Sequence, residues 1–128
     1  MAYYYSKTVK DSFDEAVSRI TKALKEEGFG ILTEIDVQET LKKKLDVDFR
    51  KYRILGACNP PFAYKALQAE DKVGIMLPCN VIVQETVDGN VEIAAVDPLA
   101  SMKAIDNPEL RKIAETIGHK LKKAIQNT

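Results

Sequence analysis

The sequence has few of the residues on which common catalytic, metal-binding and nucleic-acid-binding sites depend. Its 128 residues include one His, two Cys and no Trp. Nineteen basic side chains balance nineteen acidic ones, so the surplus of Lys and Arg that marks a nucleic-acid-binding face is absent. No apolar run approaches the roughly 20 residues of a transmembrane helix. These absences predict a protein with neither a nucleic-acid nor a membrane partner.

Signal sequences, linkers and repeats are also missing. The first six residues lack the basic and apolar pattern of a secretory signal, which predicts a cytoplasmic protein. Two Cys in a cytoplasmic chain are expected to be free thiols. A hydrophobic content of 45 % is enough to build a buried core. We therefore expect residues 1–128 to form a single domain.

Two segments have the apolar spacing of long amphipathic helices. Ser12 and Glu15 form a capping box that predicts the start of the first helix, and Gly28 predicts its end. Asn107 followed by Pro108 predicts the start of the second helix. Shorter helices are expected over residues 36–45 and 60–68 and after Asp97, and each of them begins with a residue that can cap a helix.

Four segments have the pattern of β-strands, over residues 3–9, 29–36, 52–58 and 91–96. A further apolar run over residues 73–86 contains Pro78, which predicts a bulge, an edge or a sharp bend in that strand. Asp88 and Gly89 predict a hairpin turn. Simple alternation in the second strand places Phe29, Ile31, Thr33 and Ile35 on one face and Leu32, Glu34 and Asp36 on the other.

The order of these elements is a strand, a long helix, four strands with short helices between them, and a long helix. It favours an α+β two-layer sandwich, with a mainly antiparallel sheet and the long helices on one face. A doubly wound parallel sheet is the weaker alternative. The other face of such a sheet must be covered by the short helices, by a ligand or by a second subunit.

Two Cys-Asn dipeptides, Cys58-Asn59 and Cys79-Asn80, are the most unusual local feature. A Cys just before a helix can have a lowered pKa and act as a nucleophile, but most free Cys residues are small buried hydrophobes. Asn59 is explained as a helix cap before Pro60, whereas Asn80 stands in an apolar strand where Asn is unusual. A reversible disulfide between the two thiols is a minority alternative, because no C-x-x-C motif is present.

Other chemistry has weaker support in the sequence. Glu34 lies within a strand and would need a partner if it were covered, and Arg53 on another strand is a plausible one. No metal is expected, because a zinc site needs three or four ligands with suitable spacing. Glu115 and His119 are four residues apart on the last helix and form only an adventitious metal-binding candidate.

Three segments together, residues 30–37, 52–60 and 77–81, resemble the bacterial and archaeal family known as domain of unknown function 302. The resemblance implies a small α+β domain with a TATA-binding-protein-like order of strand, helix, four strands and helix. It also implies a homodimer, and it implies no established reaction. The family's motif residues in this chain are Thr33-Glu34, Cys58-Asn59-Pro60 and Pro78-Cys79-Asn80.

These observations support three functional hypotheses. The first is a small-molecule-binding module with a pocket near the two Cys-Asn motifs, whose candidate ligand-binding residues are Glu34, Arg53, Cys58, Asn59, Cys79 and Asn80. The second is a thiol-dependent enzyme or redox sensor that uses Cys58 or Cys79. The third is a homodimeric structural protein that associates through its sheet. The sequence indicates no particular cofactor and does not decide whether a reaction is catalysed.

Overall fold

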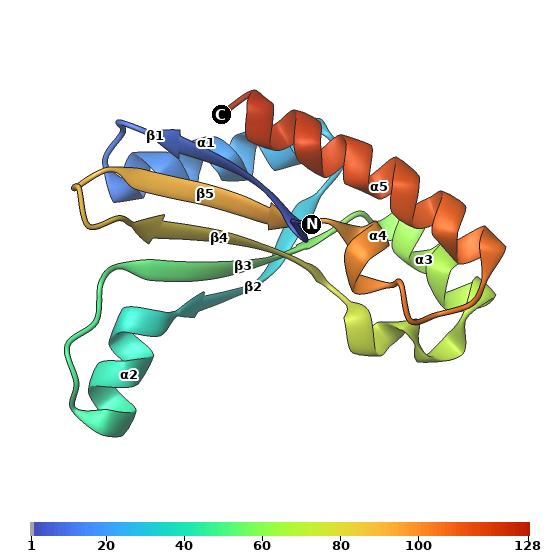
Figure 1. The fold of residues 1–128 in the computed structure, drawn as a ribbon, viewed down its shortest axis with the longest axis horizontal. Coiled ribbons are helices and arrows are strands. Elements are labelled where there is room, and N and C mark those ends of the chain that lie inside the picture. Colours follow the sequence, from blue (N-terminus) through green and yellow to red (C-terminus); the bar gives the residue numbers. More distant parts are fainter. Residues whose placement is uncertain (1) are drawn as a thin grey trace.

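A five-stranded antiparallel sheet with its two long helices on one face makes up the computed structural model, which describes residues 2–128 (Figure 1). The strand order is β1-β5-β4-β3-β2, and every neighbouring pair is antiparallel. The elements are β1 (Tyr4–Val9), α1 (Phe13–Glu26), β2 (Gly30–Asp36), α2 (Val37–Leu45), β3 (Tyr52–Cys58), α3 (Pro60–Ala69), the 3-10 helix η1 (Asp71–Met76), β4 (Cys79–Glu85), β5 (Val91–Val96), α4 (Pro98–Ser101) and α5 (Pro108–Gln126). The predicted α+β sandwich is confirmed, and the parallel alternative is wrong.

Polar side chains begin the helices where the sequence predicts them. Each of four caps accepts a hydrogen bond from a backbone amide of the first turn, at 3.0–3.2 Å: Ser12, Asp36, Asp97 and Asn107. Gly28, at a φ of 89°, follows the end of α1. These signals depend on neighbouring residues only, which is why the sequence alone reveals them.

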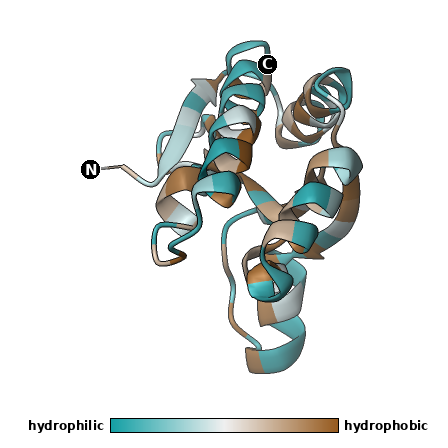
Figure 2. Ribbon diagram, turned by 90° about the vertical axis from the view of Figure 1, so that its right-hand side faces the viewer, coloured by the Kyte–Doolittle hydropathy of each residue, from teal (hydrophilic) through white to brown (hydrophobic). Residues whose placement is uncertain are grey.

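The main core lies between the sheet and the long helices. Ile20 and Leu24 of α1 and Leu121 of α5 are fully buried against Val81 and Ile93 of the sheet. Burying one such side chain contributes about 1.5–3 kcal/mol relative to leaving it exposed. Figure 2, seen from the end that carries α3 and α4, shows hydrophobic and hydrophilic residues alternating around the helices, as is typical of amphipathic helices.

A second, smaller core lies beyond the end of the sheet. The first half of α5 extends past the strands and packs with α3 and α4, and η1 packs with α3 (Figure 1). The buried residues of this second core are Ala66, Val73, Met102, Leu110 and Ala114. The two cores meet where β3 ends and β4 begins, and this junction positions the candidate site.

A β-bulge in β2 changes which residues face the helices. The register pairs Ile31 with Ala57 but Thr33 with Gly56, so Leu32 is the extra residue. Because Ala57 is buried beneath the helices, Ile31 faces them too, and the odd-numbered residues after it face the opposite side. The predicted common face of residues 29, 31, 33 and 35 is therefore wrong, since the bulge reverses the alternation.

Pro78 separates two elements instead of interrupting one strand. Residues 71–76 form η1, and β4 begins at Cys79, immediately after a cis Leu77-Pro78 peptide bond. The expected bend is present, but the continuous strand over residues 73–86 is wrong. Pro78 lies outside β4, so its missing N–H takes no hydrogen bond from the sheet.

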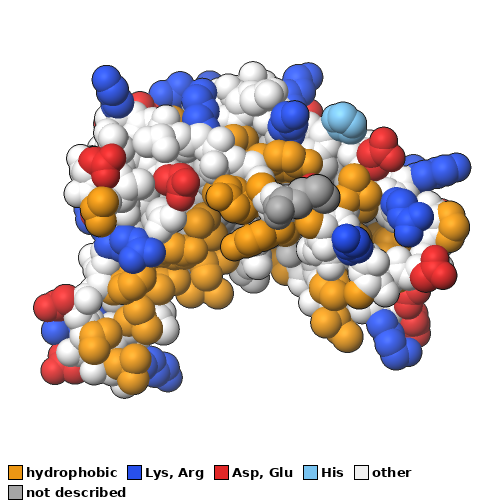
Figure 3. Space-filling model, viewed as in Figure 1, with side chains coloured by type: hydrophobic (Ala, Val, Ile, Leu, Met, Phe, Trp, Pro, Cys, Tyr) orange, Lys and Arg blue, Asp and Glu red, His pale blue; other side chains and the backbone are white. Residues whose placement is uncertain are grey.

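The sheet face turned away from α1 and α5, here called the open face, combines a group of apolar side chains with polar ones such as Asn80, Gln84 and Glu92. Figure 3 shows hydrophobic side chains gathered on the hollowed underside of the molecule, between α2 and the end that carries α3. The open face carries Tyr4, Ile35, Tyr52, Ile54, Ile82 and Val96. Tyr4 is 43 % exposed and Ile35 is 47 % exposed. Within residues 2–128, no helix has both the length and the apolar character needed to cross a bilayer.

Candidate functional site

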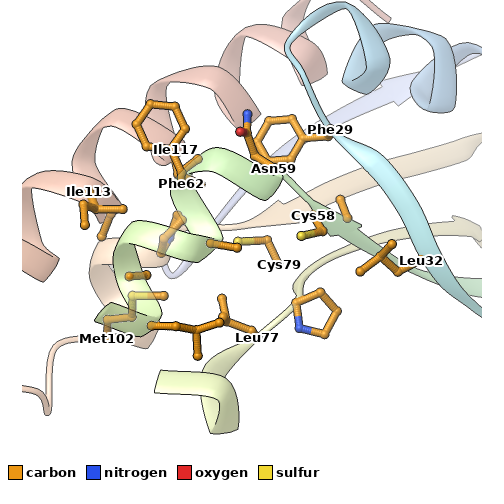
Figure 4. A pocket seen from close by; sticks show the side chains of 17 residues that line it. Phe29, Leu32, Cys58, Asn59, Phe62, Leu77, Cys79, Met102, Ile113 and Ile117 are labelled. Atoms are coloured by element: carbon orange, nitrogen blue, oxygen red, sulfur yellow. The ribbon is translucent and has the colours of Figure 1, made fainter. Parts of the chain in front are cut away.

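An apolar cavity of about 290 Å³ lies at the junction of the two cores. Its walls come from the ends of β3 and β4 and from α3 and α5 (Figure 4). No charged side chain lines it among the residues that the structure describes. Its larger lining side chains include Phe62, Leu77, Met102, Ile113 and Ile117. Because the cysteines of both Cys-Asn motifs also line it, we call it the thiol-lined cavity.

The two thiols come from adjacent strands. Cys58 ends β3 and Cys79 begins β4, and Ala57 pairs with Cys79 in the sheet register. Figure 4 shows both side chains at the wall of the cavity, with the sulfur of Cys58 directed towards Cys79. Both residues are free thiols. Sequence reasoning left open whether they lie together, and the structure brings them to one cavity.

The environment of Cys79 disfavours ionisation of its thiol. Its side chain is buried, and this burial raises the pKa of the thiol to about 11, with a further contribution from the charge of ionised Cys58. At neutral pH the thiol of Cys79 therefore remains protonated. A nucleophilic or metal-binding Cys needs the opposite shift.

Asn59 does not cap α3, although it precedes this helix. Its Nδ2 donates instead to the backbone carbonyl of Glu27, at 3.2 Å, and no hydrogen bond from the first turn reaches its side chain. The predicted side-chain cap is wrong: Pro61 has no N–H at the second helical position, and the side chain of Asn59 bonds Glu27 instead of accepting from the N–H of Phe62 at the third. Asn59 is 7 % exposed and supplies the one amide side chain among the described residues that line the cavity.

Gly28 makes the close approach of Asn59 possible. A Cβ atom at Gly28 would lie 3.0 Å from Nδ2 of Asn59, which is closer than normal van der Waals contact. The φ of 89° at Gly28 is also a conformation that other residues rarely adopt. The end of α1 and the start of α3 therefore meet through a glycine and a buried amide.

Glu34 and Arg53 form the expected ion pair, but away from the thiol-lined cavity. Nη1 of Arg53 lies 2.9 Å from Oε1 of Glu34, and its Nη2 lies 3.5 Å from Oδ2 of Asp36. The guanidinium also lies over the ring of Phe13, 5.4 Å from its centroid. None of these residues lines the cavity. The ion pair joins β2 to β3, which makes it a structural feature of the sheet.

Asn80 lies on the opposite face of the sheet from Cys79. It is exposed and lines a separate hollow of about 470 Å³ on the open face, together with Tyr4, Tyr52 and Ile82. The six candidate residues are therefore divided among three places. Cys58, Asn59 and Cys79 share the thiol-lined cavity, while the other three do not contribute to it.

Sequence reasoning missed the helical half of the cavity wall. Phe62 of α3 and Ile113 and Ile117 of α5 line it. Their spacing is that of an ordinary core-facing stripe, so no signal in the sequence distinguishes a cavity wall from a packed core. Glu115 and His119 are both exposed on α5. Across residues 2–128, no three or more His, Cys, Asp or Glu side chains group in a way that could hold a metal ion.

Comparisons with known proteins agree with the resemblance found in the sequence. The family model described as domain of unknown function DUF302 matches residues 5–128. A solved structure described as the crystal structure of uncharacterized conserved protein DUF302 from Bacillus stearothermophilus is similar, with a TM-score of 0.92 and 30 % sequence identity. The alignment covers 99 % of this chain and 98 % of that chain. A search of curated proteins finds no match.

Proposed function

The chain belongs to the DUF302 family, and we propose that it is a binding module for a small, mainly apolar molecule held in the thiol-lined cavity. The observation that carries this proposal is the composition of the cavity wall, which combines apolar side chains with one buried amide and two thiols. Small-molecule sites are typically apolar hollows with few polar groups that set the orientation of the ligand. The thiols of the motif residues Cys58 and Cys79 supply those groups here, while Asn59, bonded to Glu27, holds the wall in place.

The volume of the cavity limits the size of the ligand. A dry apolar cavity of about 150 Å³ accommodates benzene. By proportion, the 290 Å³ of the thiol-lined cavity would hold a ligand with about twelve non-hydrogen atoms. Such a ligand would gain stability mainly from burial of its apolar surface.

Thiol chemistry has less support as the function. The raised pKa of Cys79, about 11, leaves it almost wholly protonated at neutral pH, where it would be a poor nucleophile. Cys58 is half-buried and remains the thiol available to an enzyme or a redox sensor. Neither a base nor a charged partner stands among the described residues of the cavity wall to activate it. Binding therefore accounts for the site better than catalysis does.

Methionine methyl NMR tests the binding proposal inside the protein itself. Met102 lines the cavity, whereas Met76 is 37 % exposed on η1 and does not line it. Titration with decan-1-ol, an uncharged chain of ten carbons, is expected to shift the Met102 methyl resonance saturably and to leave that of Met76 unchanged. If decan-1-ol leaves the Met102 resonance unshifted up to its solubility limit, the proposal is wrong.

A cavity-filling variant provides the matched control. Ala63 lines the cavity, whereas Ala104 is exposed and does not line it. Ala63→Leu is expected to weaken decan-1-ol binding at least fivefold, because the added side chain occupies space that the ligand needs. Ala104→Leu should bind decan-1-ol as the wild type does. Equal affinities in the two variants would place the ligand elsewhere.

The open face favours a second function, which is self-association as a homodimer. Its apolar side chains include Ile82 at the centre of the sheet and the partly exposed Tyr4 and Ile35 at its two edges. Contiguous exposed apolar surface of this kind marks interaction sites. A second copy of the chain would cover it by placing the same face against itself, as a two-fold symmetric interface does.

Sedimentation equilibrium tests this second candidate. Ile82→Glu places a charge at the middle of the open face and is expected to make the protein monomeric at micromolar concentration. Ile75→Glu is the control, because Ile75 is 81 % exposed on η1 and belongs to neither the sheet nor the lining of the hollow on the open face. A wild type that is already monomeric at micromolar concentration would rule out the dimer.

A further inference from the structure

The ammonium groups of two lysines on different helices each lie near the same ring, which forms part of the cavity wall. Nζ of Lys65 on α3 lies 5.3 Å from the centroid of the Phe62 ring. Nζ of Lys120 on α5 lies 6.0 Å from the same centroid. Phe62 itself lines the thiol-lined cavity. The apolar cavity therefore has two positive charges beside one of its walls.

Neither of these ammonium groups forms an ion pair within residues 2–128. Lys123, which follows Lys120 by three residues on α5, does have such a partner, because its Nζ lies 3.7 Å from Oε2 of Glu27. Two like charges held at one ring repel each other, and the attraction of a cation to the ring face offsets this only in part. An anion that contacts both ammonium groups would reduce this repulsion.

The cavity wall leads towards these charges along α5. Ile113, Ile117 and Lys120 follow one another at helical spacing, so the row passes from two cavity-lining residues to a cation. Figure 4 shows Ile117, Phe62 and Asn59 along the same side of the cavity. Leu77 and Met102, on the other side, are apolar. The site thus has one end beside cations and an apolar remainder.

We propose that the ligand of the thiol-lined cavity is a medium-chain fatty carboxylate, whose carboxylate is bound by Lys65 and Lys120 beside Phe62 and whose chain fills the cavity. This inference rests on the binding function proposed above. A saturated chain of ten carbons with its carboxylate has twelve non-hydrogen atoms, which matches the size of about twelve inferred from the volume. The long flexible side chains of the two lysines allow both ammonium groups to reach one carboxylate at the edge of the ring.

The test compares decanoate with decan-1-ol, which differ in charge but share a ten-carbon chain, using the Met102 methyl titration at pH 7.5. In the double variant Lys65→Gln/Lys120→Gln, decanoate is expected to bind about tenfold more weakly, while decan-1-ol binding changes less than twofold. Raising the salt concentration from 50 to 500 mM should weaken the binding of decanoate to the wild type but not to the double variant. Retained binding of decan-1-ol shows that the double variant is folded.

A matched control uses a third lysine of α5. Nζ of Lys122 lies 5.9 Å from the centroid of the Tyr5 ring, which does not line the cavity. Lys122→Gln should bind both probes as the wild type does. If decan-1-ol binds but decanoate binding is the same in the double variant, the carboxylate inference is wrong and the binding function stands. If neither probe shifts Met102, both proposals are overturned.

Discussion

The side chain of Asn59 donates from Nδ2 to the backbone carbonyl of Glu27, across the contact between the start of α3 and the end of α1. Asn59 also lines the thiol-lined cavity, so this single hydrogen bond fixes part of the cavity wall against the main core. Asn59 stands at the N-cap position of α3, but its side chain bonds the end of α1 and makes no hydrogen bond with the first turn of α3. A residue that the sequence presents as a local cap is therefore a long-range contact.

Replacing Asn59 with Ala should destabilise the protein. The substitution removes the donor to Glu27 and leaves a partly buried carbonyl without its partner, which costs about 1–3 kcal/mol in free energy of unfolding. Urea denaturation measures this loss. Asn127→Ala is the control, because Asn127 is exposed and its side chain has no hydrogen bond within the described chain. Equal free energies of unfolding for the two variants would contradict the structural role of Asn59.

Gly28→Ala should also be destabilising, by at least about 1 kcal/mol, because the added Cβ meets Asn59 and the backbone has a φ of 89°. Gly30→Ala is the matched control, since a Cβ there meets no atom within 4 Å. Urea denaturation should show little loss for this second variant. In an Asn59→Ala background, Gly28→Ala should cost less than it does alone, because the steric contact has been removed. Identical costs in the two backgrounds would exclude that contact.

The fold could be predicted largely because its signals are local. Ser12 and Asn107 each predict the start of a helix from a pattern that spans four residues. Asp88-Gly89 predicts the hairpin between β4 and β5. The bulge at Leu32 could not be predicted, because it exists only in the pairing of β2 with β3. The sequence shows the alternation within one strand, whereas the sheet face that a residue occupies also depends on how that strand pairs with the adjacent strand.

The candidate site could be predicted only in part, for a related reason. Cys58 and Cys79 line one cavity because β3 and β4 are neighbours in the sheet, a pairing that the sequence left open. Asn80 follows Cys79 directly and therefore faces the other side of the strand, as the two-residue period of a strand requires. Phe62 and Ile117 have the spacing of any buried helical stripe, so their place beside a cavity depends on packing that a single sequence does not encode locally.

Glu34→Gln tests whether the Glu34–Arg53 pair is separate from the cavity. Because both side chains are partly exposed, loss of the pair is expected to lower the free energy of unfolding by no more than about 1 kcal/mol. Decan-1-ol binding, measured through the Met102 resonance, should stay within twofold of the wild type. A larger loss of affinity would mean that Glu34 contributes to ligand binding, as the sequence alone suggested.

The stability of the protein should fall at alkaline pH because of Cys79. Its thiol has a pKa of about 11 in the folded chain against an ordinary value of 9.0, so the folded state holds this proton more tightly than the unfolded state does. The resulting stabilisation is complete below about pH 9 and is lost as the pH rises through 11. It amounts to about 2 kcal/mol, since each unit of pKa difference is equivalent to about 1.4 kcal/mol and partial hydration reduces the total.

Urea denaturation between pH 8 and 11 should therefore show a smaller alkaline loss for Cys79→Ala than for the wild type. Cys58→Ala keeps the buried thiol of Cys79 and should retain most of the loss. Parallel pH profiles for the wild type and Cys79→Ala would show that Cys79 ionises as readily in the folded chain as in the unfolded one, and the argument against a reactive Cys79 would fail with it.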